Sequence, residues 1–171
     1  GDSKKFPLKE NDALKPKNIY ATSKVINEIS AKSFSKQFNM KIFGLRFFTI
    51  YGEWGRPDML LFKIFKSSLE NKKLRLNNRG NHYRDFTYIG DVVKILHLLM
   101  NKKNKKKFDI YNICSNNPQS IKKLISYFQK KIANLNVINI PKNKLDVFKT
   151  HGNNIKIIKA LNYKSFKNFE S

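Results

Sequence analysis

The stretch from residue 41 to residue 51 constrains the fold more than any other part of the chain. It reads Lys-Ile-Phe-Gly-Leu-Arg-Phe-Phe-Thr-Ile-Tyr, and residues of this kind favour strands. A nearly continuous apolar run is typical of a strand that is buried in a parallel sheet. Residues 18–38 before it carry apolar side chains at helical spacing, namely Ile19, Ile26, Ile29, Phe34 and Phe38. We therefore expect a helix that leads into a buried strand.

Helical and strand-like segments continue to alternate along the rest of the chain. Asp58 and Ser120 can cap helices, and Asp91 can open another. The expected helices cover about 58–69, 91–100, 121–132 and 153–161. The expected strands cover about 74–76, 85–89, 108–113 and 137–140. This order predicts an α/β fold that contains part of a parallel sheet and a small α/β lobe.

The composition limits the possible partners and the cellular compartment. The chain has 171 residues and a formal net charge of +23, but only five arginines, whereas dedicated nucleic-acid binders favour the bidentate arginine fork. We interpret the lysines as a solvated surface that could help to capture anionic small molecules, with nucleic-acid binding as the less favoured alternative. The single cysteine, Cys114, fits a reducing compartment, and no apolar stretch is long enough to span a membrane. A cytoplasmic location follows by default.

The sharpest local motif is Tyr20-Ala-Thr-Ser-Lys24. Residues four apart on a helix share one face, so the phenol and the ammonium would lie together. A nearby ammonium favours the phenolate, which makes a tyrosine usable as a general base near neutral pH. The spacing alone also fits an ordinary pair on a helix surface, and the motif needs support from the rest of the sequence.

Further motifs follow in a fixed order. They are Leu45-Arg46-Phe47-Phe48-Thr49-Ile50-Tyr51-Gly52, Trp54-Gly55-Arg56-Pro57-Asp58-Met59, Arg84-Asp85-Phe86-Thr87-Tyr88-Ile89 and Asp91-Val92-Val93, with weaker matches at Tyr111-Asn112-Ile113 and Asp146-Val147. With this set the chain resembles the extended short-chain dehydrogenase/reductase family, also called the NAD-dependent epimerase/dehydratase family. It is most similar to UDP-glucuronate 4-epimerases, and the resemblance covers nearly the whole chain.

The resemblance implies the C-terminal part of a Rossmann-like parallel sheet plus a small α/β substrate-binding lobe. Residues 1–52 would end the Rossmann-like domain and carry the Tyr-x-x-x-Lys helix. Residues 53–171 would form mainly the substrate-binding lobe, with some segments that return to the sheet. The implied cofactor is NAD, and the implied substrate is a UDP-sugar, in particular UDP-glucuronate that is converted to UDP-galacturonate.

The family's chemistry implies roles for the two motif residues. Tyr20 would take the proton of the sugar 4-hydroxyl while a hydride leaves C4 for NAD, and Lys24 would hold the nicotinamide ribose and tune Tyr20. The transient 4-keto sugar would turn and receive the hydride on its other face. The cofactor is regenerated in this way, so no external redox partner is needed.

The resemblance also implies substrate contacts downstream. Thr49 would meet the sugar, where a hydroxyl can donate to a uronate carboxylate, and Arg56 would lie near the sugar nucleotide. Arg84 would pair with the UDP diphosphate, which suits a guanidinium, and Leu76 would shape the uracil pocket. Alternatively, Arg56 makes only a surface contact, Arg84 forms a structural ion pair with Asp85 or Asp91, and Leu76 is a core residue. Arg46 lies inside a strand and is assigned a structural role.

The glycine-rich motif that binds the cofactor pyrophosphate at a helix N-terminus does not occur in this sequence. In the family it lies well upstream of the catalytic tyrosine, as does the Ser/Thr that assists the tyrosine. We therefore expect that the chain lacks the N-terminal cofactor half and is inactive alone. A separate chain could supply that half, and the open sheet edge left without it would favour association. A homodimer is a further possibility.

Some positions depart from the family pattern and leave the reaction open. Glu53 replaces a common proline, Gly90 stands where aspartate is usual, and Asn77 stands where an aromatic residue is frequent. The alternative reactions are 4,6-dehydration and decarboxylation within the same superfamily. A non-catalytic basic binding module is the alternative outside enzymes.

Overall fold

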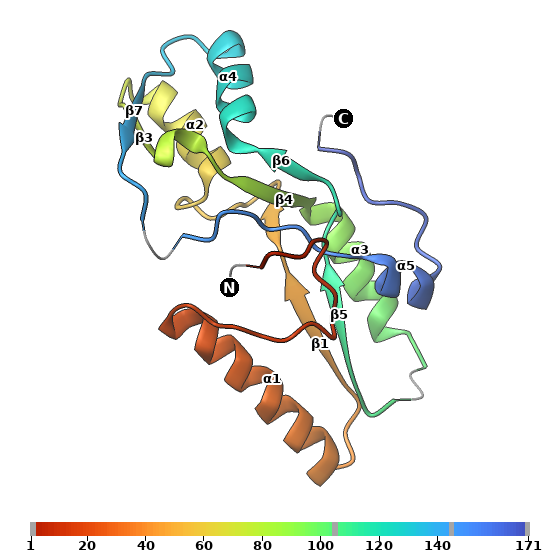
Figure 1. The fold of residues 1–171 in the computed structure, drawn as a ribbon. Coiled ribbons are helices and arrows are strands. Elements are labelled where there is room, and N and C mark those ends of the chain that lie inside the picture. The colour runs from red at the N-terminus through yellow and green to blue at the C-terminus, as the bar shows by residue number, and fades with distance from the viewer. Residues whose placement is uncertain (1–2, 104–105, 144–145, 170–171) are drawn as a thin grey trace.

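The computed structural model describes residues 3–103, 106–143 and 146–169. Helices and strands alternate along the chain (Figure 1). The helices are α1 (Ile19–Gln37), α2 (Leu60–Leu69), α3 (Ile89–Met100), α4 (Ile121–Lys131) and α5 (Ile155–Leu161), with a 3-10 turn, η1 (Asn78–Gly80). The strands are β1 (Ile42–Phe47), β2 (Thr49–Tyr51), β3 (Leu74–Asn77), β4 (Tyr83–Tyr88), β5 (Phe108–Ile113), β6 (Pro118–Ser120) and β7 (Val137–Ile140).

Most strand pairs are parallel, so the predicted α/β class is confirmed. β1 and β5 pair in parallel from Ile42 opposite Phe108 to Phe47 opposite Ile113. β2 is parallel to β4, and β6 joins β4 in the antiparallel direction. β3 and β7 form another parallel pair.

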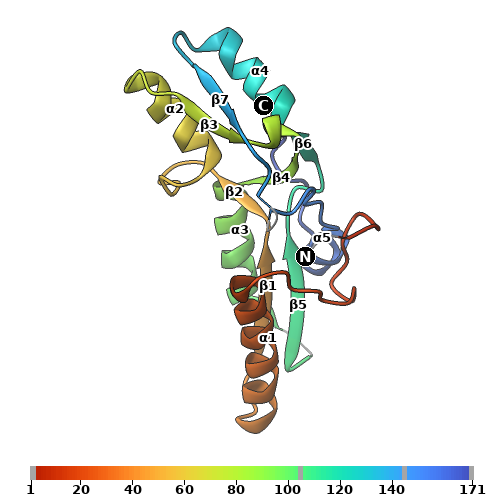
Figure 2. The ribbon, with the colours of Figure 1, turned by 60° about the vertical axis from the view of Figure 1, so that its left-hand side comes forward.

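The molecule has two parts, a body built on the β1–β5 pair and a smaller lobe. α1 lies on one side of the long β1–β5 pair, and α3 and α5 lie on the other (Figure 1). The lobe, with α2, α4, β3 and β7, sits at one end of this pair (Figure 2). The core of the body consists of Val92, Ile95, Leu99, Tyr111, Ile113 and Ile157. The core of the lobe consists of Ile64, Leu74, Leu76, Phe86, Ile121, Leu124, Ile125 and Leu135.

The stretch at 41–51 does not form the single buried strand that its composition predicts. The chain leaves the β1–β5 pair at Phe48, and Thr49 begins β2, which belongs to the sheet of β4. The residues of this stretch are half-buried or exposed. Among the described residues β1 has β5 as its one strand partner, so its second edge is not covered by a strand. This open edge fits the expectation that further strands belong beside it.

The remaining elements follow the sequence with few differences. Ser120 caps α4 as predicted, since its hydroxyl accepts a hydrogen bond from the Lys123 N–H at 3.4 Å. Asp58 does not cap α2; the capping position is Met59, and the Asp58 carboxylate binds Arg56 instead. β6 was not predicted, because a three-residue strand that starts with Pro118 has no recognisable pattern. Within the described ranges, no helix has the length and apolar character that crossing a bilayer requires.

A buried carboxylate joins the lobe to the body. Asp85 on β4 is 0% exposed, and its Oδ1 accepts hydrogen bonds from the Ser115 N–H at 3.1 Å and the Ser115 hydroxyl at 2.7 Å. Its Oδ2 accepts from the Gly152 N–H at 3.1 Å. Burial raises the pKa of this carboxyl, while the three donors act in the opposite direction. Asp85 thus ties β4 to the chain after β5 and to the segment that leads into α5.

The neighbouring Cys114 is also completely buried. A Cβ added at Gly152 would lie 2.5 Å from the Cys114 sulfur and 2.5 Å from the Phe48 ring, so the two segments are in close contact there. Burial raises the pKa of the Cys114 thiol. The prediction that Cys114 is a small buried residue is confirmed.

We expect Asp85→Asn to lower the free energy of unfolding by about 1–3 kcal/mol. The amide keeps one acceptor oxygen but turns an NH₂ group toward one of the buried N–H donors, which loses its partner. Urea unfolding followed by circular dichroism would measure the change. Glu70→Gln is the control, because Glu70 pairs with Lys66 and Lys72 at the surface and its loss should leave the midpoint nearly unchanged. Equal stability of Asp85→Asn and the native chain would contradict the role of the junction.

Candidate active site

The Tyr20–Lys24 pair lies on the first turns of α1. The helix begins at Ile19 because the Asn18 side-chain oxygen accepts a hydrogen bond from the Ala21 N–H at 2.8 Å. Lys24 Nζ lies 5.3 Å from the centre of the Tyr20 ring, so the predicted juxtaposition is present. The Tyr20 side chain is 70% exposed and can reach a bound molecule.

Two polar contacts hold α1 against the strands. Arg46 on β1 donates from Nε and Nη2 to the Glu28 carboxylate, both at 2.8 Å, in a pair that is mostly shielded from solvent. Near the C-terminal end of α1, the buried Ser35 hydroxyl is 2.7 Å from the Met40 carbonyl oxygen and 2.9 Å from that of Lys107. Arg46 is therefore structural, as the sequence indicated, and it fixes the direction in which α1 presents Tyr20.

Thr49 and Arg56 come from β2 and the loop that follows it. Thr49 is the first residue of β2 and stands opposite Phe86 of β4. Arg56 donates from Nε to Asp58 Oδ1 at 2.9 Å and from Nη2 to Asp58 Oδ2 at 2.6 Å. This hydrogen-bonded carboxylate raises the pKa of Arg56, and Tyr20 adds a smaller electrostatic contribution.

A cavity of about 550 Å³ opens between β2, the loop and α2. Thr49 and Arg56 line it together with mainly apolar side chains, including Trp54, Met59 and Phe62. The cavity brings two of the predicted substrate residues, Thr49 and Arg56, into one space. We take it as the candidate site.

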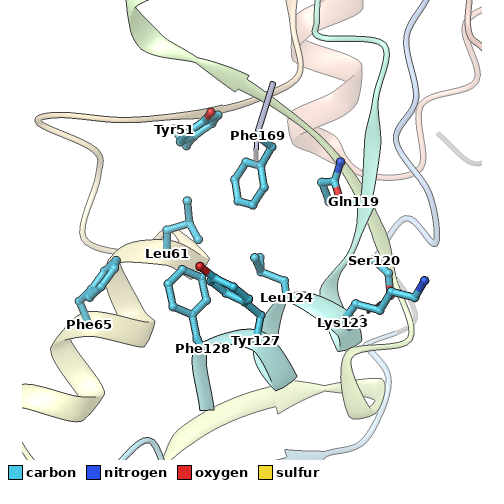
Figure 3. A pocket seen from close by; sticks show the side chains of 10 residues that line it. All are labelled: Tyr51, Leu61, Phe65, Gln119, Ser120, Lys123, Leu124, Tyr127, Phe128 and Phe169. Carbon is cyan, nitrogen blue, oxygen red and sulfur yellow. Dashed lines mark hydrogen bonds between the residues drawn. The ribbon is translucent and has the colours of Figure 1, made fainter. Parts of the chain in front are cut away.

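A second cavity, of about 530 Å³, lies between α2, α4 and the C-terminal segment (Figure 3). In Figure 3, Phe169 reaches in between Tyr51 and Gln119, and Tyr127 and Phe128 point up from α4. It shares Tyr51, Leu61 and Phe65 with the first cavity but is lined by none of the predicted site residues. Of the two cavities, only the first is lined by residues that the sequence predicts to bind substrate.

Arg84 and Leu76 lie in the lobe and do not line the candidate cavity. Arg84 Nη1 donates to the Tyr83 carbonyl oxygen at 2.9 Å and to that of Phe148 at 3.3 Å. Leu76 is 7% exposed and packs in the core of the lobe. Their roles toward a diphosphate and a base stay predictions.

The two carboxylates proposed as alternative partners of Arg84 both accept other hydrogen bonds. Asp85 binds Ser115 and Gly152, as described above. Asp91 Oδ1 accepts from the Tyr163 hydroxyl at 2.7 Å, and its Oδ2 accepts from the Lys167 N–H at 2.7 Å. These two carboxylates therefore serve to join segments of the fold.

Asp58 is the site residue whose position sequence reasoning missed. It was predicted to cap a helix, yet its carboxylate occupies the Arg56 fork. The available signal was the sequence Arg-Pro-Asp, because a proline between opposite charges keeps the two side chains near each other. Among the residues that the structure describes, no group of three His, Cys, Asp or Glu side chains is arranged to hold a metal ion.

The family assignment agrees with this geometry. The model of the NAD dependent epimerase/dehydratase family matches residues 1–114. The chain belongs to this family. NAD is the cofactor of the family, as the resemblance implied, and the fold is that of Rossmann-type epimerases and dehydratases.

Similar proteins extend well beyond the matched region. An uncharacterized protein of Methanocaldococcus jannaschii is 38% identical over 96% of this chain and 50% of its own length. UDP-glucuronate 4-epimerase 5 of Arabidopsis thaliana is 33% identical over 100% of this chain and 43% of its own length. UDP-glucuronic acid 4-epimerase of Bacillus cereus, solved with UDP-glucuronic acid and NAD, is 26% identical with a TM-score of 0.87, over 98% of this chain and 54% of its own. The chain thus spans about half the length of these relatives.

We expect Asn18→Ala to destabilise the start of α1 by about 1 kcal/mol, because the Ala21 N–H loses its side-chain acceptor. Amide hydrogen exchange at Ala21 and Thr22 should become faster, while exchange near the Ser35 end of the helix should not change. Asn18→Asp is the matched control, since it keeps an acceptor and places a negative charge at the positive end of the helix. Unchanged exchange in Asn18→Ala would show that the cap does not hold this turn.

Proposed function

We propose that the chain supplies the Tyr–Lys pair and the sugar-binding part of an NAD-dependent UDP-sugar 4-epimerase that converts UDP-glucuronate to UDP-galacturonate. One observation carries this proposal. Thr49 and Arg56 line one cavity, in a chain whose Tyr20 and Lys24 lie together and exposed at the start of α1. A general base, a hydroxyl donor and a guanidinium are the groups that a uronate 4-epimerase needs.

The residues on α1 fit NAD and the reacting hydroxyl. Lys24 is exposed one turn below Tyr20, and its ammonium can donate to the hydroxyls of a nicotinamide ribose. Bound NAD would accept the hydride of the sugar C4 and return it. Tyr20 would take the proton of the 4-hydroxyl in the first step and give it back in the second. The sugar passes through a 4-keto form in between, and no net oxidation occurs.

Thr49 and Arg56 would select the uronate. The Thr49 hydroxyl can donate to the sugar carboxylate, and Arg56 can bind it with both arms of its fork. In the free chain Asp58 occupies this fork, with both side chains mostly exposed. An ion pair so exposed contributes little to stability, so a substrate carboxylate can replace Asp58 at low cost. Arg84 would then meet the diphosphate, and Leu76 would back the uracil ring.

The cofactor half would come from further polypeptide, either continuous with this chain or separate. No glycine-rich cofactor motif occurs in the sequence, and the relatives are about twice as long as the matched region. α1 offers an apolar surface for such a half, with Ile19 89%, Ile29 61% and Phe34 55% exposed. A second copy of the chain could use the same surface. Without its cofactor half we expect the chain to be inactive.

Reconstitution tests the proposal directly. The chain would be co-expressed with the N-terminal half of the Bacillus cereus epimerase, and the complex would be given NAD and UDP-glucuronate. Interconversion with UDP-galacturonate at unchanged mass would support the proposal. Loss of water or of carbon dioxide would instead indicate a dehydratase or a decarboxylase. A folded complex without any turnover, or salt-sensitive nucleic-acid binding without nucleotide-sugar binding, would count against an epimerase.

In the reconstituted enzyme we expect Tyr20→Phe to lower kcat by about 10²–10⁴-fold, because the proton of the 4-hydroxyl loses its acceptor. The unfolding midpoint should stay the same, since the Tyr20 side chain is 70% exposed. Tyr127→Phe is the control, because it removes a hydroxyl from a tyrosine that is 57% exposed on α4, away from the candidate cavity. A kcat within a factor of about two of the native value in Tyr20→Phe would rule out this base.

A further inference from the structure

Two side chains outside the predicted site connect the Arg56 loop to the rest of the molecule. Tyr88 is the last residue of β4, and Glu53 lies in the loop three positions before Arg56. The Tyr88 hydroxyl lies 3.1 Å from Glu53 Oε1 and 3.2 Å from Glu53 Oε2. A hydrogen bond that a phenol donates to an ionised carboxylate is stronger than one between two neutral groups.

Gly52 packs closely against Ile89, but among the hydrogen bonds of the described residues this pair has no substitute in the loop. The other hydrogen bonds of residues 52–58 run within the loop or to Met59, as with Arg56 to Asp58 and the Met59 N–H to the Arg56 carbonyl oxygen. Among the hydrogen bonds of the described residues, those of Glu53 with Tyr88 alone join this segment to an element beyond α2. An exposed loop that few hydrogen bonds join to the rest of the molecule opens easily.

The surroundings of Tyr88 are shaped for this contact. A Cβ added at Gly90 would lie 2.6 Å from Tyr88 Cε1, so any larger residue there would displace the ring. The Lys167 ammonium lies over the same ring, 4.7 Å from its centre, and the Lys167 N–H is anchored on Asp91. Glycine at position 90 and the C-terminal segment therefore both define where the Tyr88 hydroxyl points.

The charges agree with the geometry. Hydrogen bonds from its own backbone and from Tyr88, together with the charge of Lys167, lower the pKa of Glu53. The hydrogen bond and the negative charge of Glu53 raise the pKa of Tyr88. At neutral pH the pair therefore consists of an ionised acceptor and a protonated donor.

We propose that the Glu53–Tyr88 pair is a positioning device that holds the 52–58 loop and thereby fixes Arg56 at the candidate cavity. That Arg56 meets a sugar carboxylate rests on the function proposed above, whereas the ordering of the loop does not. Glu53 and Tyr88 act through Arg56 and are positioning residues rather than catalytic ones.

The chain carries its own probe for this proposal. Trp54, the one tryptophan, follows Glu53 directly and is fully exposed, so its indole signal reports on the loop without interference. The indole ¹⁵N relaxation of Trp54 would be measured in the 171-residue chain, together with that of the Arg56 guanidinium. We expect Tyr88→Phe and Glu53→Ala each to raise the population of the open loop about fivefold, the size expected for one exposed hydrogen bond.

Three further variants make the result specific. Glu53→Gln keeps an acceptor oxygen and should restore most of the order. Gly90→Ala should loosen the loop without removing a polar group, because the methyl displaces the Tyr88 ring. The double variant Glu53→Ala/Tyr88→Phe should be no looser than either single one, since the two residues form one contact. Tyr127→Phe is the control and should leave Trp54 unchanged.

Unchanged relaxation in both single variants would overturn the proposal, and so would additive loosening in the double variant. In the reconstituted enzyme, Tyr88→Phe should raise KM for UDP-glucuronate about fivefold with kcat little changed, whereas Tyr20→Phe lowers kcat. If the loop loosens while KM for UDP-glucuronate stays unchanged, the order of the loop does not affect substrate binding. Turnover of another sugar nucleotide in place of UDP-glucuronate would overturn the proposed substrate but leave the loop measurement intact.

Discussion

The structure depends on one buried carboxylate. Asp85 is completely enclosed, and its two oxygens bind backbone groups of segments that lie far apart in the sequence. The lobe has its own apolar core, and the body has another, so hydrophobic burial alone does not specify how the two are joined. A charged acceptor with three directional donors does specify it, because any other orientation would leave an ionised group buried without partners. The orientation of β4 against the body is therefore fixed, and so is that of β2, which pairs with β4.

The site inherits its geometry from this junction and from the contacts of α1. Arg46 and Ser35 fix the helix that carries Tyr20, while the pairing of β2 with β4 fixes Thr49 and the start of the Arg56 loop. The two sets of residues come from different elements, and the docking of both elements on the same body sets their relative placement. A parallel sheet of this kind commonly places functional loops at the ends of its strands.

The sequence predicted the helices, most strands and the Tyr20–Lys24 pair better than it predicted the packing. Tyr20 and Lys24 could be paired from helical spacing, and β5 and β7 from short apolar runs, since both signals are local. The break at Phe48 could not be predicted, because the residues on either side favour strands equally and only the pairing with β5 or β4 decides where each belongs. Local patterns were equally silent on the contact between Glu53 and Tyr88, which are 35 positions apart. Side-chain partners across a loop depend on tertiary positions that no periodicity encodes.

Because Cys114 is buried at the junction, the reactivity of its thiol can report on that junction. This single thiol lies against Gly152, next to Ser115, and is inaccessible while Asp85 holds the surrounding segments together. A thiol that is buried and held protonated reacts with alkylating reagents only when its surroundings open. The rate at which Cys114 is labelled under native conditions is therefore a direct measure of how often the lobe and the body separate. One sulfur atom can thus report the opening of this junction, with no engineered probe.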